Sequence, residues 1–152
     1  MLKAKHFAIQ ELVPEHVFLA RGEQAWQLID DRVIMLIDAM RERYGPMVIN
    51  TWHSKKMRDT YGLRQWSGLR TLPYWVAMHG EEKGLEKYLA SFSQHKFGRA
   101  FDAVFRDCTA EQVRADVRLH PEWFPGLTAI ETDISWFHGD VRNCAPIMEF
   151  KP

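Results

Sequence analysis

Apolar residues recur at intervals of three and four between about residues 23 and 44, and charged residues fill the positions between them. This spacing places the apolar side chains on one side of an amphipathic helix that packs against a core. The apolar positions are Trp26, Ile29, Val33, Leu36, Ile37, Met40 and Tyr44. Gly45 and Pro46 follow directly and predict the end of this helix.

Shorter patterns divide the remaining chain into strands, helices and one long loop. Strands are predicted at residues 47–51, 99–105, 127–132 and 135–141, where short apolar runs or alternating patterns occur. Helices are predicted at residues 73–89, with a break near Gly80, and from the capping pair Thr109 and Gln112 to about residue 119. The polar, aromatic and glycine-rich stretch 52–70 predicts a surface loop. Helices with a small, mainly antiparallel sheet indicate an α+β fold.

Length and composition fit a single domain that spans residues 1–152. The chain is 46% hydrophobic and 26% charged, and it holds 20 Lys+Arg against 20 Asp+Glu. Because the charges balance, the composition gives no attraction to nucleic acid or to an acidic membrane surface. The two cysteines, Cys108 and Cys144, form no CxxC pair, and we expect them to be reduced, partly buried thiols.

The N-terminus and the hydropathy of the chain bear on its location. The first residues, MLKAKH, contain no apolar h-region of a signal peptide. No apolar run approaches the roughly 20 residues that a membrane span needs. We therefore expect synthesis in a cytoplasm and no membrane span. If the substrate lies outside the cell, another route must release the protein.

The segment SQHKFGRAFD, residues 93–102, carries the strongest chemical signal. His95 and Asp102 are an odd number of positions apart, so on one continuous strand they would face opposite sides. Gly98 lies between them and can adopt the backbone angles of a turn, which brings His95 back over the strand that follows. Asp102 then stands on the face of that strand opposite the apolar side chains. The five identities of SxHxxGxAxD would occur by chance in about one chain in ten thousand of this length.

A second histidine lies in the segment WFHGD, where alternation places Trp136, His138 and Asp140 on one face of the last predicted strand. His95, Asp102 and His138 together offer two imidazoles and one carboxylate. Three protein ligands with a fourth position open to water are typical of catalytic zinc, which lowers the pKa of that water to about 7. We expect one zinc ion here, although the same ligands also suit ferrous iron.

The pattern SxHxxGxAxD, followed by a strand with W/F-x-H-x-D, resembles the zinc D-alanyl-D-alanine carboxypeptidase family, which shares its fold with the hedgehog signalling domain. The likeness is greatest to small phage and prophage members that cut peptidoglycan peptides, and it runs from about residue 6 to Arg142. The resemblance implies that His95, Asp102 and His138 bind zinc and that Ser93 steadies the site. It also implies a hedgehog/DD-peptidase-like fold and a peptidoglycan stem peptide as the substrate.

The chain departs from the family pattern at the arginine that faces the substrate. Family members often carry S-G-Y-R-S just after the first strand, and here His53 stands where that arginine would fall. The sequence SGLR, which ends at Arg70, resembles the motif after an insertion. We assign the role to Arg70, which can hold a carboxylate or stabilise an oxyanion; the alternative is an ordinary surface arginine. Ser93, His53 and Trp136 are further candidates for contact with the substrate.

A second departure concerns the general base. Many relatives place an acidic residue three positions before the last zinc histidine, and here that residue is Ser135. Glu131 ends the predicted strand beside that of His138, and it is our first choice for moving a proton from water to the leaving amine. Asp140 is the second candidate, either to orient an imidazole or to move protons.

These patterns lead to the hypothesis of a zinc metallopeptidase of phage type that degrades the cell wall. The alternative is a non-catalytic wall-binding or phage structural module whose zinc holds the fold. Trp52, Tyr61, Trp66 and Tyr74 in or beside the predicted loop either line a groove or form the core of that loop. The sequence leaves open whether the bond cut is terminal or internal, and also the oligomeric state.

Overall fold

The computed structural model describes residues 1–152 as an α+β fold with six α-helices and a five-stranded mixed sheet. The strand order is β1-β2-β4-β3-β5; β1, β2, β4 and β3 pair antiparallel, and β5 runs parallel to β3. The strands are β1 (Met47–Val48), β2 (Ala100–Phe105), β3 (Ala129–Glu131), β4 (Phe137–Asp140) and β5 (Met148–Phe150). The α+β class is confirmed, and the parallel edge strand makes the sheet mixed.

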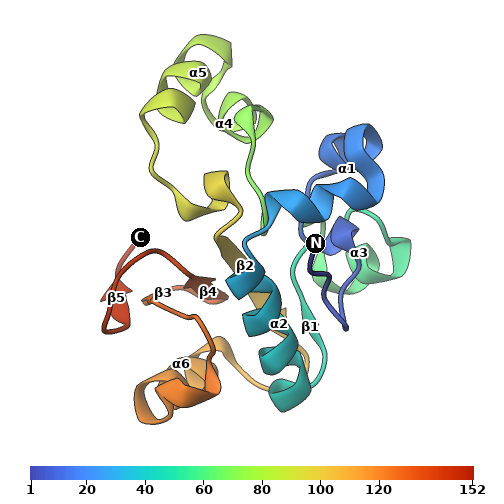
Figure 1. Cartoon of the computed structure of the whole chain (residues 1–152). Helices are drawn as coiled ribbons and strands as arrows, with labels where there is room; N and C mark the ends of the chain where they lie inside the picture. The colour runs from blue at the N-terminus through green and yellow to red at the C-terminus, as the bar shows by residue number, and fades with distance from the viewer.

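Helices α2 and α6 lie against the sheet, α1 and α3 lie on the side of β1, and α4 and α5 form a hairpin that extends away from it (Figure 1). They are α1 (Glu15–Arg21), α2 (Asp31–Tyr44), α3 (Lys55–Tyr61), α4 (Leu72–His79), α5 (Glu81–Ala90) and α6 (Ala110–Leu119). Short 3-10 turns cover Ile9–Glu11, Gly22–Leu28, Gln94–Phe97 and Pro121–Trp123. None of the helices combines the length and apolar character that crossing a bilayer would need. The two cysteines are free, half-buried thiols, as predicted.

The core lies between one face of the sheet and helices α2 and α6. Phe101 of β2 and Phe137 of β4 are fully buried in it, with ring centroids 6.1 Å apart, together with apolar residues from both helices. The capping pair Thr109 and Gln112 begins α6 as predicted. Because Phe101 and Phe137 turn to this core, the alternate side chains Asp102 and His138 face the other way.

Helix α2 begins later than its apolar pattern predicts. Residues 22–28 form a 3-10 turn, and Ile29 and Asp30 are extended. The Asp30 N–H donates to the Gly98 carbonyl at 3.0 Å, and the Asp30 side chain accepts from the Arg32 N–H as the helix cap. A tertiary contact with the turn after His95 therefore interrupts the helical spacing.

Three other elements differ from prediction. The loop predicted at residues 52–70 contains helix α3, which Ser54 caps by accepting from the Met57 N–H. Strand β1 is shorter than predicted, because the Asn50 and Thr51 N–H groups donate to the carbonyls of Glu11 and Arg64 instead of a neighbouring strand. Strand β5 has no counterpart among the predicted elements. The break at Gly80 between α4 and α5 is confirmed, and its φ is +81°.

Candidate metal centre

Three neighbouring strands place Asp102, His138 and Glu131 in one row across the sheet. In the antiparallel register Asp102 lies opposite His138, and His138 lies opposite Glu131. Opposite residues of neighbouring strands have Cβ atoms about 4.5–5.5 Å apart, so the three side chains stand side by side on one face. This face is the one turned away from the core. The sheet alone therefore brings together an imidazole and two carboxylates.

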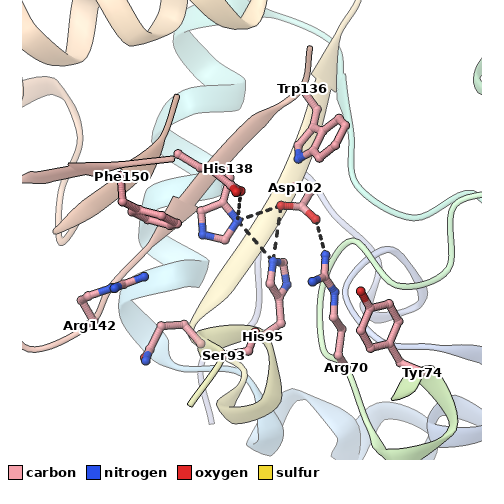
Figure 2. A pocket seen from close by; sticks show the side chains of 11 residues that line it. Arg70, Tyr74, Ser93, His95, Asp102, Trp136, His138, Arg142 and Phe150 are labelled. Carbon is pink, nitrogen blue, oxygen red and sulfur yellow. Dashed lines mark hydrogen bonds and ion pairs between the residues drawn. The ribbon is translucent and has the colours of Figure 1, made fainter. Parts of the chain in front are cut away.

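His95 reaches this row from the 3-10 turn Gln94–Phe97, which lies outside the sheet. The turn ends at Gly98, whose φ of +66° lies in the left-handed region, as the sequence predicts. A Cβ on Gly98 would lie 1.9 Å from the Leu28 carbonyl oxygen, so only glycine fits there. The His95 ring, only 2% exposed, then points toward Asp102 (Figure 2).

The segment with the sequence SGLR, residues 67–70, contacts both strand β2 and the turn that carries His95, and it holds them in place. The Ser67 carbonyl accepts from the Asp102 N–H at 2.6 Å, and the Gly68 carbonyl lies 2.7 Å from His95 Nδ1. The Arg70 N–H in turn donates to the His95 carbonyl at 3.0 Å. A Cβ on Gly68 would lie 2.1 Å from a backbone oxygen, so this close approach also requires glycine. The segment is thus part of the site.

Three side-chain atoms converge beneath the surface (Figure 2). His95 Nε2 lies 3.2 Å from His138 Nδ1 and 3.3 Å from Asp102 Oδ1, and the last two atoms are 2.8 Å apart. Tetrahedral zinc ligands at about 2.0–2.1 Å from the ion lie about 3.3 Å from one another. Two edges of the triangle match this spacing, and the third needs a small movement of the carboxylate. The group could therefore hold a metal ion.

The outer nitrogens of both imidazoles have acceptors of their own. His95 Nδ1 lies 2.7 Å from the Gly68 carbonyl oxygen, and His138 Nε2 lies 3.4 Å from Asp140 Oδ2. With a metal bound, these partners would hold the ring protons on the outer nitrogens. The inner nitrogens and the Asp102 oxygen could then each offer a lone pair to one shared ion. Three acceptors this close repel one another unless a proton or a metal ion lies among them, so the donor set fits a metal ion that displaces the proton between His138 and Asp102.

The charges around the triangle also favour a cation. Burial lowers the pKa of His138, but hydrogen bonds with Asp102 and Asp140 and the charges of these carboxylates outweigh it and raise the pKa to about 9. Burial raises the pKa of Asp102, yet the charge of His95 and the hydrogen bonds with both imidazoles hold it well below its usual range. Burial lowers the pKa of His95. The carboxylate thus stays ionised and stabilises positive charge beside it.

Glu131 stands beside the triangle in an open hollow of about 330 Å³. Its Oε2 lies 4.0 Å from His138 Nδ1, and its side chain is 16% exposed. A general base must reach its proton directly or through one water molecule. Glu131 meets this condition for a water molecule next to the ligand atoms, and it is not itself one of the three converging groups.

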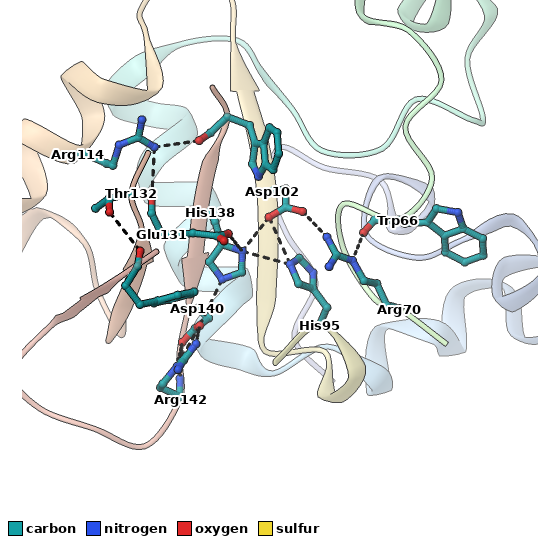
Figure 3. Close-up of polar contacts among 12 residues, drawn as sticks. Trp66, Arg70, His95, Asp102, Arg114, Glu131, Thr132, His138, Asp140 and Arg142 are labelled. Atoms are coloured by element: carbon teal, nitrogen blue, oxygen red, sulfur yellow. Dashed lines mark hydrogen bonds and ion pairs between the residues drawn. The ribbon is translucent and has the colours of Figure 1, made fainter. Parts of the chain in front are cut away.

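Arg70 lies in the same hollow and is fixed there (Figure 3). Its Nη2 donates to Asp102 Oδ2 at 2.6 Å, and its Nε donates to the Trp66 carbonyl at 2.8 Å. Its guanidinium carbon lies 4.7 Å from the centroid of the Tyr74 ring. The ion pair turns the other Asp102 oxygen toward the histidines, so Arg70 positions a candidate metal ligand as well as facing the hollow.

The other predicted site residues divide into those that line the hollow and those that do not. Ser93 and Trp136 lie on its wall. Asp140 is fully buried beneath His138 and lies outside the lining, so its place suits orienting the imidazole rather than contact with a substrate. His53 lies away from the hollow, and its ring packs edge-on against Trp52 at 5.8 Å. The structure does not bring His53 to the ligands.

The aromatic residues of the predicted loop also divide. The Trp52 indole N–H donates to the Val13 carbonyl at 2.8 Å, so this ring is packed into the fold. Tyr74 lines the hollow, and its ring meets that of Trp66 edge-on at 5.9 Å. Tyr61 lies at the end of helix α3, away from the site. Tyr74 alone among these four lines the hollow.

Two further residues of the hollow escaped the sequence patterns. Phe150 of β5 extends the row, opposite Glu131, and its ring lies 5.6 Å from that of His138. The Arg142 guanidinium stacks over Phe150 at 4.8 Å and binds both oxygens of Asp140. The only signal for strand β5 in the sequence is one aromatic residue, Phe150, in a short run between two prolines. This signal is too weak to predict a strand.

Arg114 of helix α6 is a third residue that the sequence did not reveal. It is buried, and its guanidinium donates to the carbonyls of Ile134 at 2.8 Å and Trp136 at 2.9 Å. A third, longer bond of 3.5 Å reaches the Glu131 carbonyl. Arg114 therefore fixes the turn between β3 and β4, which follows Glu131 and contains Trp136. Figure 3 shows Arg114 beside Glu131.

Comparison of the chain with protein families, with curated proteins and with solved structures gives no match.

Proposed function

We propose that the chain is a zinc-dependent peptidase that hydrolyses amide bonds of peptidoglycan stem peptides. The observation that carries the proposal is the convergence of three acceptor atoms from His95, Asp102 and His138 with a carboxylate 4.0 Å away in an open hollow. Two imidazoles and one carboxylate are a ligand set of catalytic zinc sites, and a base beside them is what hydrolysis needs.

The three ligands would hold the ion, which supplies Lewis acidity to a carbonyl oxygen and lowers the pKa of water. Glu131 Oε2 takes the proton of the attacking water and gives it to the leaving nitrogen. Asp140 keeps the His138 ring in the orientation that turns Nδ1 inward. Arg70 holds Asp102 in place and contributes positive charge near the oxyanion that develops.

The class of substrate rests on the likeness of SxHxxGxAxD and WFHGD to the carboxypeptidase family. The hollow itself suits a peptide, because Trp136, Tyr74 and Phe150 supply apolar walls around a polar floor. The proposal includes that the chain is an enzyme of phage type, which reaches the cell wall when the host cell lyses. In a wall-binding module, the same three ligands would only hold the fold.

Purified protein tests the proposal directly. The protein is incubated with peptidoglycan and with short stem peptides, with zinc or with a chelator, and new amino termini and free D-alanine are measured. We expect release that stops with the chelator and returns with zinc. If the chelator lowers the melting temperature while no product ever appears with zinc, the protein is a binding module.

Glu131→Gln tests the role of the base. We expect kcat to fall by about a factor of 100 to 10,000, the usual contribution of a general base, while the zinc content stays at one ion per chain. Glu86→Gln on the exposed face of α5 is the control, because it removes the same charge far from the ligands. An unchanged kcat in Glu131→Gln would exclude this residue as the base, and lost zinc would make it a ligand.

A further inference from the structure

A second hollow adjoins the first at the Arg70–Asp102 ion pair. It has a volume of about 260 Å³ and shares these two residues with the first hollow. Its other wall residues are Leu63, Arg64, Gln65, Trp66 and Ser67. In Figure 3, Trp66 lies beyond Arg70 as seen from His138. A chain bound across the ligands would therefore meet both hollows.

The two hollows differ in their charge. The first is lined by two arginines, Arg70 and Arg142, and by the carboxylates of Asp102 and Glu131. Arg70 binds Asp102, and Arg142 binds the buried Asp140 beneath the lining. The second is lined by two arginines, Arg64 and Arg70, against the single carboxylate of Asp102. The second hollow is thus lined by one more cationic than anionic side chain.

Arg64 carries this charge, and two hydrogen bonds fix the position of its side chain. Its Nε donates to the Ile49 carbonyl at 3.0 Å, and its Nη2 donates to the Asp102 carbonyl at 3.3 Å. These carbonyls fix the plane of the guanidinium without neutralising it, and Arg64 forms no ion pair. Nη1 makes no hydrogen bond within the protein and is not sealed from solvent. A fixed guanidinium with free donors is suited to a carboxylate.

We propose that the second hollow is a substrate subsite that binds a carboxylate through Arg64. The inference rests on the proposed function, because it concerns the substrate of the same site. The carboxylate is either the free C-terminus of the peptide or an acidic side chain within it.

Asp102 does not prevent an anion from entering. Its Oδ2 is bonded to the Arg70 guanidinium at 2.6 Å, and its Oδ1 is turned to the two histidines. The charge that the carboxylate presents to the second hollow is therefore compensated by Arg70. Arg64 remains as the charge that an incoming group meets.

Binding to the metal-free protein tests the subsite separately from hydrolysis. Three probes are titrated and followed by the NMR signals of the arginine Nε–H groups. They are N-acetyl-D-alanyl-D-alanine, its C-terminal amide, and an amidated dipeptide with a glutamate side chain. We expect at least one charged probe to bind about tenfold more tightly than the neutral amide, as one charge-assisted hydrogen bond allows, and to shift the Arg64 signal. The charged probe that binds identifies the source of the carboxylate.

Arg64→Gln should abolish the preference for the charged probes, and Arg64→Lys should keep part of it because the charge remains. Arg21→Gln, at the exposed end of helix α1, is the matched loss of one positive charge far from the hollow. If Arg64→Gln fails to fold, the shift of the Arg64 signal in the wild-type protein still decides the question. Equal binding of all three probes, or equal losses in Arg64→Gln and Arg21→Gln, would overturn the subsite.

This test and the test of hydrolysis fail independently. A protein that releases product with zinc but binds the charged and neutral probes equally is a peptidase without this subsite. A protein that prefers the charged probe through Arg64 but never cleaves a peptide has the subsite and lacks the proposed activity.

Discussion

Replacement of Asp140 by asparagine isolates the orientation of His138 from the ligands themselves. Asparagine keeps the size of the side chain, so the core beneath the site keeps its volume. The change removes the charged acceptor that lies 3.4 Å from His138 Nε2 and the partner that Arg142 binds through both oxygens. The three atoms that would contact the metal are untouched.

The expected loss is a 10- to 100-fold weaker affinity for zinc. Losing the carboxylate that orients a ligand imidazole costs about this much, or about 1.4–2.7 kcal/mol. The structure supports a value within this range, because Asp140 is fully buried beneath the ring. The Arg142 guanidinium is partly exposed and regains hydrogen bonds from water.

The chain offers a matched control at Asp30. Asp30 and Arg32 form the same arrangement as Asp140 and Arg142: the backbone N–H two residues later donates to the carboxylate, and so does the guanidinium. Asp30 caps helix α2 and touches no ligand. Asp30→Asn therefore makes the same chemical change away from the metal site.

Competition with a chromophoric chelator measures the dissociation constant of zinc for the wild-type protein and both variants. We expect the affinity to fall only in Asp140→Asn, and kcat at saturating zinc to stay within a few-fold of the wild type. Equal affinities in both variants would refute the orienting role. An unchanged affinity with a kcat lowered a hundredfold would assign Asp140 to proton transfer instead.

Two further predictions concern stability. Gly98→Ala should lower the free energy of unfolding by about 2–5 kcal/mol, because a left-handed φ strains alanine and its Cβ would lie 1.9 Å from a backbone oxygen. An unchanged midpoint of denaturation in guanidinium would contradict this prediction. The hydrogen bond from the Arg32 side chain lowers the pKa of Asp30, so its contribution to stability is present above about pH 4 and is lost as the pH falls through the lower folded-state pKa. The difference in unfolding free energy between wild type and Asp30→Asn should therefore shrink below about pH 4, and a difference that grows in acid would show that the carboxylate is not stabilised by folding.

Local rules explain why the candidate ligands could be found from the sequence. Alternation along β2 and β4 fixes which side chains share a face, and Gly98 marks the turn that returns His95 to that face. Both rules act within ten residues or fewer, so a short sequence motif is enough to predict the positions of these side chains. The motif does not predict the identity of the metal, because zinc and ferrous iron accept the same ligands.

Tertiary contacts explain what the sequence did not reveal. Helix α2 starts at Asp31 because the backbone of the preceding residue pairs with Gly98, more than sixty positions away along the chain. Strand β5 is three residues long, and Met148 and Glu149 are exposed. It therefore has no buried face whose apolar residues would predict a strand from the sequence. Arg64 takes its place from the carbonyls of Ile49 and Asp102, which only the folded chain brings together.

The register of the sheet ties the site to the core. A shift of β4 by one residue against β2 would turn Phe137 toward the hollow and His138 toward helix α2. Exposing one buried phenylalanine costs about 1.5–3 kcal/mol, and burying an imidazole without partners adds to that cost. The packing of Phe101 and Phe137 therefore selects the one register in which Asp102 faces His138. Substitutions that loosen this aromatic pair should weaken metal binding even though neither ring contacts a ligand atom.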